Sequence, residues 1–220
     1  SPYRSPTDMG VNMAGNCIID DEVCREASLN EIVRRYFKCL CDQKASGVVK
    51  QERFKLELLM NQAGIALGER AVEKRAHACS DATDGQPAAA IELADGTIVV
   101  GKNGPLLGAS SSALLNALKK LAGIDQEIDL VSAHAIEPIQ TLKTTYLGSK
   151  NPRLHTDEIL IALSSSVSEN EYAAKAMEQG CDIHSTVILS SVDADTLKKL
   201  GMYLTCDPTY EEDDRMYHKR

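Results

Sequence analysis

Residues 88–124 read AAAIELADGTIVVGKNGPLLGASSSALLNALKKLAGI, and this stretch decides how the second half of the chain folds. Two short apolar runs, 88–93 and 97–101, flank Asp95 and Gly96, a dipeptide typical of β-hairpin turns. A loop with Gly and Pro follows. Apolar residues then recur at helical spacing up to Gly123, a residue suited to the left-handed end of a helix. The stretch therefore predicts a hairpin followed by a helix.

Strands and helices continue to alternate beyond residue 124. The pattern predicts strands near 128–132, 185–189 and 202–205, and helices near 136–147, 156–163, 169–179 and 193–200. Such alternation is typical of helices layered on a sheet. We therefore expect an α/β fold, with a three-layer α/β domain and a mixed sheet over residues 83–206.

The residues before this domain predict helices only. Asp20 and Asp21 suit the start of a first helix as a cap and a dipole-matched acid. Further helices are expected at 51–63 and 68–80, with Phe54, Leu58 and Leu59 facing inward on the former.

These predictions divide the chain into four parts. A helical subdomain spans 20–82, and the linker SDATDGQP at 80–87 joins it to the α/β domain. Residues 1–19 form an irregular lead-in from an upstream region, and residues 207–220 form a charged tail.

Composition limits the class of partner. The chain has 24 Lys and Arg against 32 Asp and Glu, a net charge of −8. General nucleic-acid binders and membrane-surface proteins usually present a basic face, so we expect no nucleic acid and no membrane as partners. The seven cysteines are odd in number and irregularly spaced, which is typical of reduced thiols. We therefore expect a cytoplasmic protein.

Four long motifs carry a resemblance to a known family. They are SPTDMGVNMAGNCIIDDE at 5–22, LLGASSSALLNALKKLAGID at 106–125, LGSKNPRLHTDEILIALS at 147–164 and HSTVILS at 184–190. Together they resemble the C-terminal part of the uncharacterised bacterial protein family number 0371. The resemblance implies a longer protein, whose upstream α/β region carries a Gly-rich, P-loop-like segment. It implies no activity, because none is established for the family.

A second resemblance concerns topology alone. A hairpin, a Gly/Ser loop and a helix in this order resemble the opening of the cytidine-deaminase fold. In that fold the helix start carries a zinc ligand and a Glu, and a P-C-x-x-C motif supplies two more ligands. Here serines occupy the helix start, and no P-C-x-x-C occurs. We therefore expect no metal and no cofactor.

Two polar clusters are candidate ligand sites. Ser110, Ser111 and Ser112 stand at a predicted helix start, where free N–H groups and hydroxyls suit a phosphate or carboxylate. Ordinary helix capping is the alternative. In the second cluster Arg153 suits an anion, and His155 is a candidate proton carrier with Asp157 or Glu158 to orient it. A loop followed by a capped helix, in which Thr156, Asp157 and Glu158 satisfy the N-terminal amides, is the alternative.

Asn16 and Asp20 are weaker candidates for ligand binding. They follow Gly10 and Gly15 in a loop-to-helix turn, where turn and capping chemistry accounts for them as well. His184 precedes a predicted strand and is a candidate to join His155.

Two functions remain open at this point. In the first, the chain is part of an enzyme that binds a small anionic metabolite. In the second, it is a non-catalytic ligand-binding or oligomerisation module that supports the upstream P-loop-like region. A homo-oligomer is expected under both. Convergence of Arg153, His155 and the 110–112 serines on one pocket favours the first.

Overall fold

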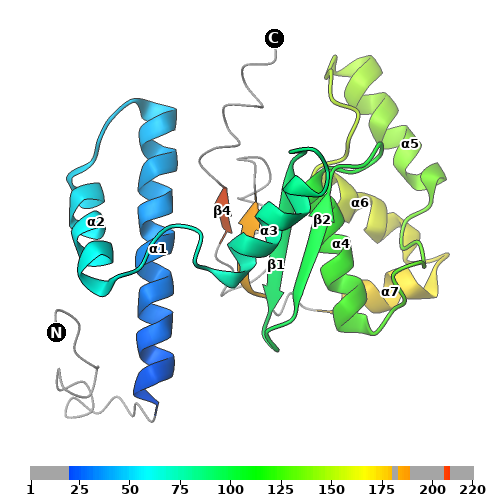
Figure 1. Ribbon diagram of the computed structural model, residues 1–220. Coiled ribbons are helices and arrows are strands. Elements are labelled where there is room, and N and C mark those ends of the chain that lie inside the picture. Colours follow the sequence, from blue (N-terminus) through cyan, green and yellow to red (C-terminus); the bar gives the residue numbers. More distant parts are fainter. Residues whose placement is uncertain (1–19, 180–182, 189–205, 209–220) are drawn as a thin grey trace. The chain divides into compact units, whose positions relative to one another are not determined.

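The computed structural model describes residues 20–179, 183–188 and 206–208, which belong to two compact units. One unit lies within residues 1–71 and the other within 72–220, and each is treated separately below (Figure 1). The lead-in, the helix and strand expected at 193–200 and 202–205, and the tail from residue 209 lie outside the described residues.

The described residues of the first unit form a pair of helices. α1 spans Asp21–Ser46 and α2 spans Gln51–Ala63, as the sequence predicts. Asp20 caps α1, because its carboxylate accepts the Val23 N–H at 3.0 Å. Gly47 ends α1 at φ 70°, a left-handed conformation that glycine adopts without steric cost.

The core between α1 and α2 is small. Val33 and Phe37 of α1 pack with Met60 of α2. Phe54, Leu58 and Leu59 instead have exposed fractions of 60%, 57% and 43%. The prediction that they face inward is wrong. α2 is apolar on more than one side, and spacing alone does not say which side meets α1.

In the described part of the second unit, a four-stranded mixed sheet is the centre. Its strands are β1 (Ala88–Leu93), β2 (Ile98–Lys102), β3 (Ile183–Ile188) and β4 (Cys206–Pro208), in the order β2-β1-β3-β4. β1 pairs antiparallel with both β2 and β3, whereas β3 and β4 run parallel. The α/β class and the hairpin are therefore confirmed. The turn has Gly96 at φ 80°, and Asp95 Oδ1 accepts the Thr97 N–H at 2.8 Å.

Alternate residues of the hairpin face opposite sides of the sheet. Ala88 and Ala90 pack with Val72 and Ala76 of α3 (Ala71–Asp81). From Val72 onward this helix belongs to the sheet unit, whereas the sequence places it in the helical subdomain. The two compact units divide near residue 71. Helical periodicity shows that α3 has an apolar side but not which element covers it.

The opposite face of the hairpin packs on α4 (Ala109–Ala122), where Ala89 and Ile91 join the main core. That core also receives α6 (Thr156–Ser166) and α7 (Glu171–Glu178). Helix α5 (Ala133–Thr141) continues into the π-helical turn η2 (Leu142–Tyr146). Figure 1 shows α4, α6 and α7 close together beside the sheet.

The strand predicted near 128–132 is wrong. These residues form bends, and Leu130 and Val131 are buried in the main core. The side-chain amide of Asn170 donates to the carbonyls of Asp129 and Leu130. These two carbonyls therefore have a hydrogen-bond partner without a neighbouring strand. Across the described part of the chain, every helix is too short or too polar to cross a membrane.

Candidate functional site

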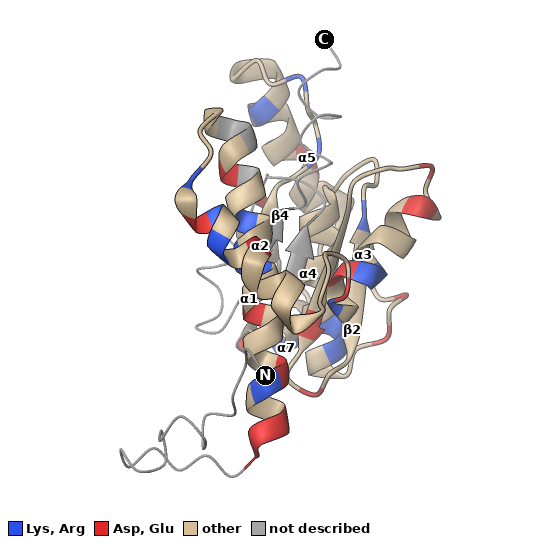
Figure 2. Ribbon diagram, turned by 60° about the vertical axis from the view of Figure 1, so that its left-hand side comes forward, with Lys and Arg blue, Asp and Glu red and all other residues tan. Residues whose placement is uncertain are grey.

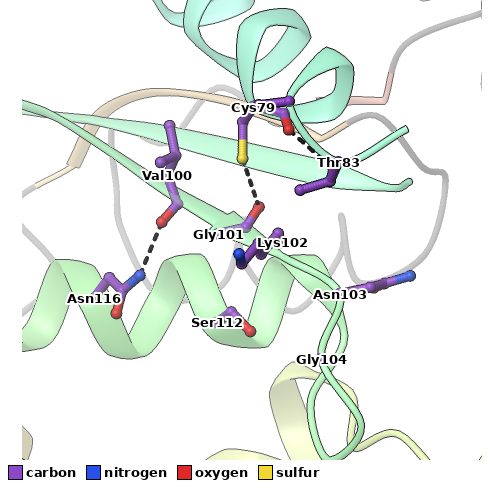
Figure 3. A pocket seen from close by; sticks show the side chains of 10 residues that line it. Cys79, Thr83, Val100, Gly101, Lys102, Asn103, Gly104, Ser112 and Asn116 are labelled. Carbon is purple, nitrogen blue, oxygen red and sulfur yellow. Dashed lines mark hydrogen bonds between the residues drawn. The ribbon is translucent and has the colours of Figure 1, made fainter. Parts of the chain in front are cut away.

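A pocket of about 570 Å³ lies beside β2 in the second unit. It is lined by Cys79, Ala82, Thr83, Val100, Gly101, Lys102, Asn103, Gly104, Ser112 and Asn116. Figure 3 shows contributions from the end of α3, from β2 and the loop after it, and from α4. Among the described residues that line it, Lys102 is the one with a charged side chain, so this lining is positive.

Gly101 sets the distance between β2 and α4. A Cβ at this position would overlap the backbone N of Ala113 and O of Ala109, and would lie 2.7 Å from Ala113 Cα. Only glycine therefore lets the strand approach the helix this closely. This contact brings Ser112 and Asn116 of α4 beside the backbone of β2.

Two side chains bind β2 from opposite sides. Asn116 Nδ2 donates to the carbonyl of Val100 at 2.8 Å, and the Cys79 thiol donates a longer bond to the carbonyl of Gly101 at 3.9 Å (Figure 3). Thr83 in turn donates its hydroxyl to the Cys79 carbonyl at 2.9 Å. These bonds fix the pocket wall on both sides of the strand.

The start of α4 is capped by Asn103. Its Oδ1 accepts the Ala109 N–H at 2.9 Å, whereas the N-cap position itself is Gly108. The three serines divide between two surroundings. Ser110 and Ser111 are buried, and Ser112 lines the pocket. Ser111 Oγ donates to the carbonyl of Leu154 at 2.8 Å, across 43 residues of chain.

The structure brings the loop before α4 and the loop before α6 together. Leu107 and Leu154 form an isolated parallel bridge. Arg153 Nε donates to the carbonyl of Gly104 at 2.7 Å, and Gly104 also lines the pocket. The serine and arginine clusters are therefore neighbours in space. Their contact is made by hydrogen bonds that hold the two loops to each other.

His155, Asp157 and Glu158 surround the start of α6. His155 is its N-cap residue, and the Glu158 carboxylate accepts the His155 backbone N–H at 2.7 Å. Asp157 accepts the Glu158 N–H at 3.0 Å. Both carboxylates therefore satisfy amides at the N-terminus of α6, as the capping interpretation expects.

Lys143 is a residue that the sequence does not single out. It is buried in η2, and its Nζ donates at 2.7 Å both to the carbonyl of Arg153 and to the Glu158 carboxylate. One amine thus links η2, the Arg153 loop and the cap of α6. A lysine next to leucine carries no sequence signal for this role. Asn116 has a clearer one, because a polar residue within an apolar helix face needs a partner.

Three candidates remain, namely Asp20, Asn16 and His184. Asp20 is the exposed cap of α1 in the first unit, and Asn16 lies outside the described residues. His184 is in β3. Within the described ranges, no group of three or more His, Cys, Asp or Glu side chains is arranged to hold a metal ion.

Most of the shifted pKa values among the described residues belong to side chains of α1, where charges of both signs follow one another (Figure 2). Hydrogen bonds from Arg34 and then Arg35 lower the pKa of Glu31 to about 2. Bonds from Lys50 and Lys38 lower the pKa of Asp42. In the second unit the Thr97 backbone N–H lowers the pKa of Asp95 in the hairpin turn.

Comparison with known proteins gives a consistent family. Residues 68–217 match the family described as "Domain of unknown function DUF1846, C-terminal", and residues 1–64 match its N-terminal counterpart. A UPF0371 protein of Corynebacterium aurimucosum is 53% identical over the whole chain, and 45% of its own length is covered. UPF0371 proteins of Corynebacterium diphtheriae and Streptococcus pneumoniae are 52% and 49% identical, with the same coverage. The chain thus spans about half the length of the curated relatives it matches.

Proposed function

For this chain, which belongs to the uncharacterised bacterial family UPF0371 with its DUF1846 domains, we propose that the second unit, which contains the sheet, binds a small anionic metabolite in the pocket beside β2. The ligand carries a phosphate or carboxylate group. The observation that supports this proposal is the described lining, in which Lys102 supplies the one charge and Asn103, Ser112 and Asn116 add polar groups. A cation with neutral hydrogen-bonding groups suits such an anion.

The position of the pocket beside the first turns of α4 also supports an anion. A helix N-terminus carries a partial positive charge. In the proposal, Lys102 and Ser112 contact the anion directly. Ser111 and Arg153 complete the ligand-binding set by shaping the loop, since Ser111 bonds to Leu154 and Arg153 bonds to Gly104. Ser110 is buried next to Ser111 in the first turn of α4.

Titration of inorganic phosphate and a panel of small carboxylates and phosphate esters tests the proposal. Lys102→Met should weaken binding of the ligand by roughly tenfold or more, because a hydrogen bond to a charged group contributes about 1.5–3 kcal/mol. Ser112→Ala should weaken it less. Lys150→Met is the matched control, since Lys150 is exposed on a loop and does not line the pocket. Equal affinities in the wild type and Lys102→Met would contradict the proposal.

Whether the ligand is also converted separates two versions of the proposal. In the enzyme version, His155 transfers a proton with Asp157 or Glu158 to orient it. In the alternative, the unit is a non-catalytic ligand-binding or oligomerisation module that supports the upstream P-loop-like region. The capping bonds of Asp157 and Glu158 favour the second version, because both carboxylates already serve the helix start.

Mass spectrometry of the bound ligand distinguishes them. After incubation with the full-length protein, chemically unchanged ligand supports the module. If the wild type converts the ligand, and the His155→Asn variant binds the ligand but does not convert it, the enzyme version is supported.

Three further features belong to the proposal. They are a cytoplasmic location, a homo-oligomeric assembly and a three-layer domain with cytidine-deaminase-like topology that works without metal or cofactor. Light scattering after size exclusion tests the assembly, and a monomer at micromolar concentration would contradict it. An experimental structure covering residues 189–205 tests the topology.

A further inference from the structure

The first unit exposes apolar side chains on α2 and on the segment that leads into it. Phe54 and Leu58 have exposed fractions of 60% and 57% and stand four residues apart, so they share one side of α2. We call this pair the outer side of α2. Val48 and Val49, in the segment that leads into the helix, are exposed by 60% and 46%.

Among the described residues, the core of this unit is small. Its central cluster consists of Val33, Phe37 and Met60, with three partly buried neighbours. Chains of this length bury a small share of their surface and are marginal without additional packing. Two helices with a core of this size need additional packing to be stable.

The family match assigns the two units to different domains. Residues 1–64 match the N-terminal DUF1846 domain, whereas the sheet unit falls in the C-terminal domain matched by residues 68–217. More than half of the relatives' length lies outside the matched region. We infer that the outer side of α2 is an intramolecular docking surface for the rest of the N-terminal domain in the full-length protein.

The chemistry of this occupant follows from the surface. Covering Phe54 and Leu58 is favourable when the partner surface is apolar. Lys55, the exposed neighbour of Phe54, places a charge at the margin. The proposed interface therefore has an apolar centre, with the charge of Lys55 at its margin.

Two lengths of protein test the inference: the 220-residue chain and the full-length protein. The variant Phe54→Gln/Leu58→Gln keeps good helix formers but removes the apolar side. In the full-length protein it should lower the melting midpoint by about 5 °C or more, since the substitutions remove apolar contacts that are buried there. In the 220-residue chain it should leave the midpoint unchanged. Ile161→Gln is the control in both lengths, because Ile161 is 64% exposed on α6 of the other unit.

Thiol labelling of the variant Leu58→Cys is a second measurement that does not depend on a damaging substitution. The introduced thiol should react at least about tenfold more slowly in the full-length protein than in the 220-residue chain. Peptide mapping separates its label from that of the native cysteines.

Three results would overturn the inference. Equal losses of midpoint in both lengths would mean that this chain covers the surface itself. An unchanged midpoint with fast labelling in the full-length protein would mean that the surface stays open. A loss accompanied by conversion of an oligomer to monomers, measured by light scattering, would mean that a second copy covers it.

Discussion

At the scale of single residues, Gly101 has the most exacting role. Alanine at this position would place its Cβ against backbone atoms of α4, which cannot rotate away as a side chain does. We expect Gly101→Ala to reduce the free energy of unfolding by about 3 kcal/mol or more, the upper range for overpacked sites. Urea denaturation followed by circular dichroism measures this change.

Gly104→Ala is the matched control for Gly101. Its added Cβ would meet its nearest neighbour, the Leu107 carbonyl oxygen, at 4.0 Å. We expect a change below about 1 kcal/mol. Similar losses in the two variants would show that the close approach of β2 and α4 is not what requires glycine.

Glu31 makes the stability of the first unit depend on pH. Its folded pKa of about 2 lies below the ordinary value of 4.5, because Arg34 and Arg35 bind the carboxylate. A lowered folded pKa stabilises the fold above the unfolded pKa, and this contribution is lost as pH falls from about 4.5 toward 2. The stability difference between the wild type and Glu31→Gln should therefore shrink over that interval.

Denaturation at several pH values between 7 and 3 measures this difference. Replacing Arg34 with Gln removes the largest cause of the shift, so it should shrink the pH-dependent part as well. A constant difference between wild type and Glu31→Gln across the whole range would contradict the prediction.

At the scale of elements, Lys143 connects η2 to the start of α6. Lys143→Met removes both bonds of the amine and leaves the Arg153 carbonyl and the Glu158 carboxylate without this donor. We expect the free energy of unfolding to fall by about 2 kcal/mol, measured by urea denaturation. Lys150→Met, on an exposed loop, should change it by less than about 0.5 kcal/mol. Equal effects of the two substitutions would rule out a linking role for Lys143.

Elements with local signals are the ones the sequence predicts. Asp95-Gly96, Gly123 and the Asp20 cap each determine backbone geometry within a few residues, and the hairpin, α4 and α1 follow from them. The segment 128–132 has the composition of a strand. Two of its backbone carbonyls instead accept hydrogen bonds from the side chain of Asn170, about forty residues away. No pattern within the segment predicts this contact.

The site divides in the same way. Capping at α6 follows from the order of Thr156, Asp157 and Glu158. The meeting of Ser111 with Leu154 and of Arg153 with Gly104 depends on contacts across 43 and 49 residues, which spacing does not encode. The pocket beside β2 depends on Gly101, whose lack of a side chain has no meaning until the helix is in place.

At the scale of the whole molecule, the two units should differ in their ability to fold alone. The main core and the cluster under α3 both lie within the sheet unit, whereas the helix pair has only its small cluster among the described residues. We expect a fragment of residues 68–220 to unfold cooperatively on heating, and a fragment of residues 1–67 to show no cooperative transition. Calorimetry of both fragments measures this. A sharp transition in the shorter fragment would contradict it.

Among the described strands, β2 lies at the edge of the sheet, and this position has a consequence for self-association. Asn103 N–H donates to Pro87 O and Leu93 N–H donates to Thr97 O, a register that turns the backbone groups of Ile98, Val100 and Lys102 away from β1. An edge of this kind is a template on which a strand from another molecule can pair and begin an aggregate. Asn116 already occupies the Val100 carbonyl at the middle of that edge, and Lys102 places a charge at its end. An incoming strand therefore meets an interrupted ladder, and the chain carries its own protection against edge-to-edge polymerisation.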